Sequence, residues 1–157
     1  MGANLIHIIF YVLGKGFAGC NKYDKRVSSE VAEWVEGTTV LLGVAFNGPS
    51  LLLKKQDGKI IMLKPETIKS PDVAIYFKSI QGALLVVTGR IGIWQAYAEH
   101  RFTLKGDIFF SMSVVRCMDS IENYLFPPFI TNKILRRRPT KSVSSLKIYR
   151  TILFGVR

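Results

Sequence analysis

The sequence has few of the side chains that metal sites and covalent catalysis need. Its 157 residues include only two histidines and two cysteines. His7 lies in an apolar run and His100 between two charged residues, and neither has further ligands at a metal-binding spacing. Cys20 and Cys117 are widely separated, and such sparse use of cysteine suits a reducing cytoplasm. Ser111, Ser113 and Cys117 have no histidine near them in the sequence to act as a base. We therefore expect no metal, no cofactor and no catalytic residue.

The chain also lacks an apolar run long enough to span a membrane. The longest run without a charge, Leu5–Leu13, falls short of the roughly 20 residues that cross a bilayer. Lys15 interrupts the apolar stretch and no basic segment precedes it, so a signal peptide is not indicated. Apolar residues still make up 48% of the chain. We expect a cytoplasmic protein whose apolar side chains line a core, a ligand cavity or a membrane contact.

Acidic side chains are absent from the last part of the chain. Residues 123–157 hold eight basic and no acidic side chains. Nucleic-acid binding is disfavoured because the basic tail from Lys133 has only Tyr149 and Phe154 available for stacking on bases. Contact with an anionic membrane surface fits better, at about 1 kcal/mol for each basic residue near the leaflet, and a tail that only meets solvent is the alternative. The candidate contact residues are Arg136, Arg137, Arg138, Lys141, Lys147 and Arg150.

The N-terminal part of the chain predicts two helices. Residues 4–18 are apolar nearly all round and favour a helix, with a strand at residues 5–13 as the alternative, because so short a run does not separate the two. The polar residues 21–27 predict a connector. Ser28 or Ser29 is a suitable N-cap for the second helix.

Alternating apolar residues and turn signals predict five strands. Asn47-Gly48 and Asp57-Gly58 are typical of two-residue hairpin turns, in which both residues need a positive φ. Two such turns in succession indicate antiparallel pairing. The expected strands are Thr39–Phe46, Ser50–Lys55, Lys59–Leu63, Asp72–Lys78 and Arg101–Lys105.

Helical spacing follows the fourth and fifth strands. It predicts helices over residues 80–88, over Ile93–Glu99, and from the N-cap Asp107 to Pro127-Pro128. The tail from Arg136 has no capping residue and scattered charge, so we expect it to be mobile or loosely attached. The order of elements indicates an α+β domain with its helices gathered on one face of the sheet.

Gly14, Gly16 and Gly19 match the GxGxxG pattern of dinucleotide-binding loops. Such a site needs an acidic residue near the end of the next strand, and that strand ends in Phe46-Asn47. The two hairpins also contradict the parallel sheet that the pattern requires. The glycines therefore favour close packing of the N-terminal helix, or a break in it.

Four short motifs follow one another in the second half of the chain. They are Asp72-Val73-Ala74-Ile75 on a strand, Thr88-Gly89 at the end of a helix, Ala96-Tyr97 on a short helix, and the strand end Phe102–Asp107, which closes in Lys-Gly-Asp. This series resembles the sterol carrier protein type 2 family. Glu99-His100 departs from the family, which often has a small residue in the turn before the last strand.

The resemblance implies a curved, five-stranded, largely antiparallel sheet covered by helices, with an internal apolar tunnel. In the family such a tunnel accepts fatty acids, acyl-CoA, sterols or phospholipids. The chain then divides into an apolar helix and connector at residues 1–27, a lipid-binding domain at 28–135 and a basic tail at 136–157. The candidate lining residues are Phe77, Leu84, Val87, Trp94, Tyr97, Phe102, Leu104, Met112, Val115 and Met118. Apolar stripes of this kind are also typical of a packed core.

The expected function is therefore lipid binding or transfer without catalysis, because a family of this kind is not catalytic when it stands alone. The partner would be a fatty acid or another apolar lipid. The alternative is a peripheral membrane or protein-interaction module that uses the apolar N-terminus and the basic tail and binds no small ligand.

Overall fold

The computed structural model describes residues 2–45, 47–87, 89–126, 132 and 141–155. Its centre is a five-stranded sheet in the order β3-β2-β1-β4-β5. Neighbouring strands are antiparallel except for β1 and β4, which are parallel. The strands are β1 (Thr39–Val44), β2 (Ser50–Gln56), β3 (Lys59–Leu63), β4 (Val73–Phe77) and β5 (Phe102–Gly106). The predicted α+β class and the largely antiparallel sheet are confirmed.

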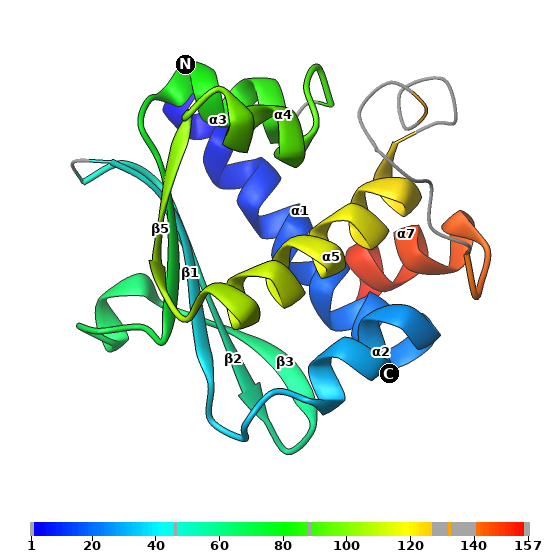
Figure 1. Cartoon of the computed structure of the whole chain (residues 1–157). Helices are drawn as coiled ribbons and strands as arrows, with labels where there is room; N and C mark the ends of the chain where they lie inside the picture. Colours follow the sequence, from blue (N-terminus) through cyan, green and yellow to red (C-terminus); the bar gives the residue numbers. More distant parts are fainter. Residues whose placement is uncertain (1, 46, 88, 127–131, 133–140, 156–157) are drawn as a thin grey trace.

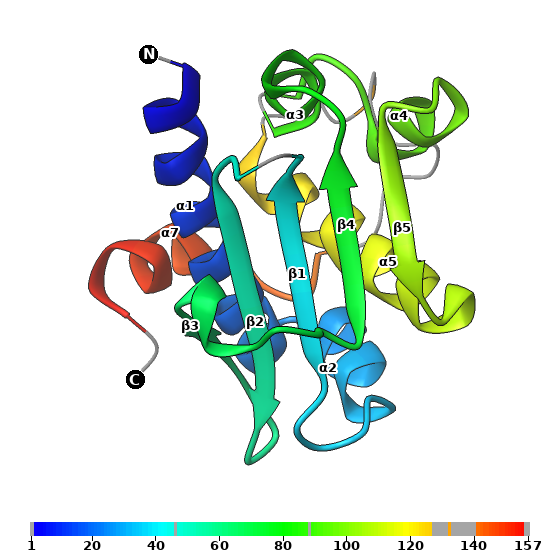
Figure 2. The same cartoon turned by 90° about the vertical axis from the view of Figure 1, so that its left-hand side faces the viewer.

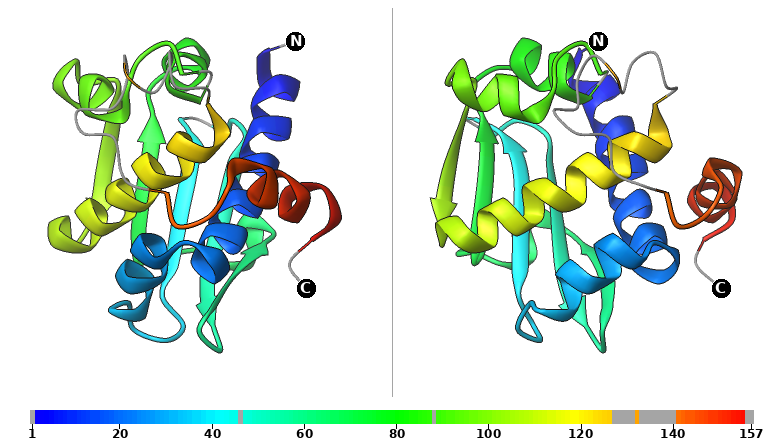
Figure 3. Two further views of the ribbon diagram at one scale, coloured as in Figure 1. Left: turned by 90° about the vertical axis from the view of Figure 1, so that its right-hand side faces the viewer. Right: turned by 45° about the vertical axis from the view of Figure 1, so that its right-hand side comes forward.

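The helices gather on one face and at one end of the sheet (Figures 1 and 2). Helices α1, α2 and α5 cover the face, α3 and α4 lie at the end, and α7 packs on the outside of α1 (Figure 3). On the opposite face, the described residues include only the segment with the short η1 helix (Figure 2). The helices are α1 (Gly2–Tyr23), α2 (Lys25–Ala32), η1 (Pro65–Thr67), α3 (Ile80–Val87), α4 (Ile93–Ala98), α5 (Ile108–Leu125) and α7 (Ser145–Phe154).

One of the two predicted hairpin turns forms as expected. Asp57 and Gly58 have φ angles of 52° and 72°, and Gln56 pairs with Lys59 across the turn. The two-residue turn predicted at Asn47-Gly48 is wrong. Of these two residues only Asn47 has a positive φ. The loop between β1 and β2 is wider than two residues, and it is closed by the hydrogen bond from the amide of Val44 to the carbonyl of Pro49. Pro49 has no backbone N–H to donate to the neighbouring strand, which suits the wider loop.

Helix α1 runs without a break from Gly2 to Tyr23, so the alternative strand at residues 5–13 is wrong. Its buried residues Ile6, Phe10, Leu13, Phe17 and Cys20 recur every three or four positions, which places them on one face. By length and composition α1 could also cross a membrane, as the only described helix of this kind. Its buried stripe packs on the sheet and on α5, as expected of a core helix.

The three glycines of the GxGxxG pattern lie inside α1 and face three different neighbours. A Cβ atom at Gly14 would lie 2.6 Å from Sδ of Met62 on β3. At Gly16 it would lie 3.1 Å from Ile121 on α5, and at Gly19 2.8 Å from Thr151 on α7. Each glycine costs a helix interior about 1 kcal/mol relative to alanine. The glycines thus allow α1 to pack closely against β3, α5 and α7. The interpretation as close packing is confirmed.

The second helix begins earlier than the sequence predicts. Asp24, not Ser28 or Ser29, is the N-cap of α2, and its side chain accepts hydrogen bonds from the amides of Arg26 and Val27. The connector expected at residues 21–27 is therefore wrong, because a single residue separates α1 from α2. Of the charged residues that suggested a connector, Lys22 lies in the last turn of α1, Asp24 is the buried cap, and Lys25 and Arg26 are exposed in the first turn of α2.

The last part of the chain also differs from the expectation. Asp107 caps α5 as predicted, by accepting a hydrogen bond of 2.7 Å from the amide of Phe110. The mobile tail expected from residue 136 instead contains helix α7, with Ile148 and Thr151 buried against α1. Tertiary contact stabilises this helix, which compensates for the missing side-chain cap at Ser144.

Candidate functional site

A cavity of about 420 Å³ lies between α1, the end of α3, the second half of α5 and α7. Ten of its twelve lining side chains are hydrocarbon or thioether, and the other two are Glu122 and Tyr149. The lining residues are Ile9, Val12, Leu13, Val86, Val87, Met118, Glu122, Leu125, Phe126, Tyr149, Ile152 and Leu153. An apolar wall with few polar groups is typical of sites that bind apolar ligands.

Helical periodicity places these residues in one wall. Val12 and Ile9 lie one turn apart on α1, as do Met118 and Glu122 on α5, and Tyr149 and Ile152 on α7. Three helices thus turn one face each toward the same space. A second hollow, of about 600 Å³ between α1 and β3, has Lys15, Lys22 and Lys59 in its wall and lacks this apolar character.

The cavity reaches the protein surface beside α7. Leu153 lines it and is 76% exposed. The hydroxyl of Tyr149, also in the wall, donates a hydrogen bond of 3.0 Å to the carbonyl of Leu125. This bond joins α7 to the end of α5 at the rim. An apolar ligand could therefore enter past α7 without disturbing the sheet.

Glu122 is a carboxyl group in an otherwise apolar wall. The residue is only 4% exposed, and its Oε2 atom has no hydrogen-bond partner among the described residues. Burial raises the pKa of Glu122 well above its ordinary value, and the nearby Asp119 raises it further. Burial also raises the pKa of Asp119 to about 6, although the indole of Trp94 donates a 2.8 Å hydrogen bond to it. The Glu122 carboxyl therefore keeps its proton to a higher pH than an exposed glutamate does.

Replacing the Glu122 carboxyl should raise the free energy of unfolding only at pH values at which this carboxyl is ionised in the unfolded chain. Near pH 4 the group is neutral in both states, but above its ordinary value of 4.5 only the unfolded chain releases the proton, so folding becomes less favourable as pH rises. We expect Glu122→Gln to raise the free energy of unfolding by about 1–3 kcal/mol at pH 7.5 and to change it little at pH 4. Urea unfolding at both pH values measures this, and an equal gain at both would contradict it.

The structure brings two of the ten predicted lining residues, Val87 and Met118, into the cavity. The other eight lie outside its wall. Phe77, Phe102 and Tyr97 form an aromatic cluster at the ends of β4 and β5, with ring centroids 5.6 and 5.8 Å apart. Trp94 binds Asp119. The remaining four, Leu84, Leu104, Met112 and Val115, pack in or against the core.

Sequence reasoning missed the residues that α1 and α7 contribute to the wall. Both helices lie outside residues 28–135, where the ligand was expected. The spacing of Tyr149, Ile152 and Leu153 was a usable signal, because it is that of one helix face. The pairing of the first helix with the last was not visible in either segment alone.

The six predicted membrane-contact residues are only partly described. Arg136, Arg137 and Arg138 lie outside the described residues. Lys141 donates a hydrogen bond of 2.7 Å to Ser145 at the start of α7. Lys147 and Arg150 are exposed on α7, where the Lys147 ammonium lies 4.3 Å from the ring centroid of Tyr23.

Several solved structures are similar to the chain. The sterol carrier protein domain 2 of Helicoverpa armigera matches with a TM-score of 0.50 and 15% identity, over 79% of this chain and 89% of its own. Sterol carrier protein 2 from Yarrowia lipolytica, in its apo form, matches with 0.48 and 15%, over 71% and 88%. UbiJ-SCP2, a ubiquinone synthesis protein, matches with 0.47 and 16%, over 66% and 89%.

Searches by sequence find no such relative. No family model matches the chain, and no curated protein matches it either. At 15% identity the structural match speaks for the fold alone, and it agrees with the motif series between Asp72 and Asp107. The chain therefore has an SCP2-like fold, as found in sterol carrier proteins.

Proposed function

We propose that the protein binds an apolar lipid in the cavity between α1, α3, α5 and α7 and catalyses no reaction. The observation that carries the proposal is the cavity itself, whose 420 Å³ lies within the range of about 300–1,000 Å³ for ligand pockets. Burying ten methylene groups there would contribute about 8 kcal/mol before the costs of ordering the ligand. Since about 8 kcal/mol corresponds to a dissociation constant of about 1 μM, ten buried methylenes set an upper limit near micromolar affinity for a fatty acid, sterol or similar lipid.

The two cysteines support a role without covalent chemistry. Cys20 and Cys117 are both buried, and burial raises the pKa of both thiols above the ordinary range. A thiol acts as a nucleophile only as the thiolate, so neither residue is suited to that role. Among the described residues, no group of three metal-ligating side chains stands together.

Filling the cavity should abolish lipid binding. Val12 lies in the wall on α1, and an indole in its place would occupy much of the space that a ligand needs. We expect Val12→Trp to weaken binding of a fluorescent fatty acid at least about ten-fold, because several buried methylenes would lose their place. Fluorescence titration measures the affinity, and native mass spectrometry of the purified protein detects any lipid that copurifies.

Two further variants make this test specific. Val35→Trp introduces the same side chain at an exposed position of the surface and should bind the probe like the wild type. Met112→Trp alters a predicted lining residue that lies outside the cavity. If Met112→Trp lost binding while Val12→Trp kept it, the ligand would lie in a tunnel between sheet and helices instead. Circular dichroism checks that each variant is folded.

A second role, contact with an anionic membrane surface, is favoured by the exposed side of α7. Leu153 and Phe154 are 76% and 73% exposed, and they share the helix with the cationic Lys147 and Arg150. Apolar side chains beside basic ones are typical of helices that lie on membranes. Because Leu153 also lines the cavity, this contact would place the cavity mouth against the lipid.

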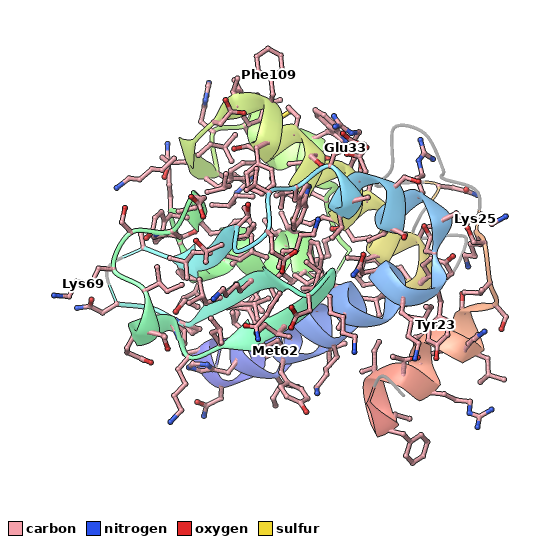
Figure 4. All side chains as sticks on the ribbon, turned by 90° about the horizontal axis from the view of Figure 1, so that it is seen from below. Tyr23, Lys25, Glu33, Met62, Lys69 and Phe109 are labelled. Atoms are coloured by element: carbon pink, nitrogen blue, oxygen red, sulfur yellow. The ribbon has the colours of Figure 1, made fainter. Side chains whose placement is uncertain are left out.

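Replacing one exposed aromatic ring tests this role. We expect Phe154→Ser to lower binding to vesicles containing phosphatidylserine about ten-fold, since the buried ring would contribute roughly 1.5–3 kcal/mol. Phe109→Ser is the matched control, because Phe109 is 82% exposed on the side of the molecule opposite α7 (Figure 4). Co-sedimentation measures the bound fraction, and equal losses in both variants would contradict a membrane contact through α7.

A further inference from the structure

The cavity wall contains one carboxyl group, that of Glu122. Glu122 lies on α5 one turn after Met118, with both side chains in the wall. Its Oε2 atom is buried and has no hydrogen-bond partner among the described residues. A buried polar atom without a partner costs roughly 1–3 kcal/mol, so a bound molecule that completes its hydrogen bonding gains affinity.

We propose that Glu122 recognises the polar end of the bound lipid, donating a hydrogen bond as a neutral acid to an uncharged head such as a hydroxyl or carbonyl. This inference rests on the proposed function and deepens it. The ligand would thus be a neutral amphiphile, with its head placed inside the cavity and its hydrocarbon part along the apolar wall.

The charges around Glu122 decide between possible heads. Its nearest titratable neighbour is another carboxyl, Asp119 on the same helix, and α7 contributes only the phenol of Tyr149. The wall residues from α1 and α3 are all hydrocarbon, so no described cation faces the group. A carboxylate head at this place would meet the Glu122 carboxyl, whose pKa Asp119 already raises, and no cation among the wall residues. Its desolvation would be uncompensated.

A cationic head is the other candidate, and the geometry favours it less. An ammonium group would have to ionise Glu122 and then be buried with it, and the desolvation of two charges commonly exceeds their attraction. A hydroxyl or carbonyl needs no ionisation. It accepts the proton of the neutral acid directly, and a hydroxyl can donate in return to the second oxygen.

Three ligands with the same hydrocarbon chain separate these cases: dodecan-1-ol, dodecanoate and dodecylamine. Calorimetry with the full chain at pH 7.5 gives the three affinities for the wild type, Glu122→Leu and Glu122→Gln. We expect Glu122→Leu to weaken dodecan-1-ol about ten-fold, the equivalent of one buried hydrogen bond, and dodecanoate less than about three-fold. Glu122→Gln keeps a donor and should retain the alcohol within about three-fold.

Each other outcome overturns the inference. Equal losses of affinity for dodecan-1-ol and dodecanoate in Glu122→Leu would mean that the carboxyl does not distinguish between the head groups. A dodecylamine affinity above that of the alcohol, lost in Glu122→Gln, would assign a cationic head. If all three bind and no ratio changes, the head-group inference fails while the proposed function stands. If none binds the wild type, both fail.

Discussion

Gly106→Ala should lower the free energy of unfolding by about 3–5 kcal/mol, through backbone strain and steric clash together. Gly106 ends β5 opposite Val73, with a φ of 106° that residues with a Cβ atom rarely adopt. A Cβ atom added there would lie 2.2 Å from the carbonyl oxygen of Asp72. No side-chain rearrangement relieves this contact, because the clashing atom belongs to the backbone.

The backbone at Asp72 is also held from its other side. Its carboxylate accepts hydrogen bonds of 2.8 and 2.9 Å from the amide and hydroxyl of Thr39, and its own amide donates to that hydroxyl at 3.0 Å. These bonds join the starts of β1 and β4, the parallel pair of the sheet. Moving Asp72 away from a new methyl group at position 106 would therefore disturb three strands.

Gly37→Ala is the matched control for Gly106→Ala. Gly37 has a similar φ of 85°, but a Cβ atom there would meet no other atom within 4 Å. Its substitution carries the strain without the clash and should cost about 1–2 kcal/mol. Urea unfolding of both variants gives the difference. Equal losses would show that the carbonyl of Asp72 moves aside at little cost.

The close contact between Gly106 and Asp72 involves residues of the motif series on which the family resemblance was based. Asp72, Gly106 and Asp107 belong to the motifs that carried the resemblance, and the structure brings them together where β4 begins and β5 ends. Asp107 then caps α5. These residues fix the sheet and the direction of the last long helix. They do not line the cavity, so the motif series predicted the sheet and its helices better than the residues of the cavity wall.

Sequence patterns predicted the structure correctly where the conformation depends on the residues of one short segment. Asp57-Gly58 forms the expected turn because both positions need a positive φ whatever surrounds them. The cavity depends instead on the contact of α1 with α7, whose residues are more than a hundred positions apart. Neither helix reveals its partner, since an apolar stripe packs against any complementary face. The lining residues Ile9, Val12, Ile152 and Leu153 were missed for this reason.

Asp24→Ala should lower the free energy of unfolding by about 3 kcal/mol, because one buried carboxylate joins three parts of the chain. Asp24 is 1% exposed and lies between α1 and α2. It caps α2 through hydrogen bonds from the amides of Arg26 and Val27, at 2.9 and 3.0 Å. Its other oxygen accepts from the hydroxyl of Tyr124 on α5.

The same hydroxyl connects this centre to the segment before α7. It accepts a hydrogen bond of 2.9 Å from the amide of Ser142, whose side chain accepts one of 3.0 Å from the amide of Lys25. Removing the carboxylate leaves the cap empty and the buried phenol without its acceptor. The loss should therefore exceed the 0.5–2 kcal/mol that a helix cap alone contributes, by about 1–2 kcal/mol.

A double-mutant cycle separates the cap from the contact with Tyr124. Asp24→Asn keeps an acceptor for the amides and should cost only about 1 kcal/mol, whereas Tyr124→Phe removes the phenol hydroxyl. In urea unfolding, Asp24→Ala combined with Tyr124→Phe should cost about 1–2 kcal/mol less than the sum of the single losses, because the phenol no longer lacks an acceptor. Strict additivity would mean that the two groups act independently. In that case Asp24 would stabilise the protein only as the N-cap of α2, and the segment before α7 would depend on other contacts.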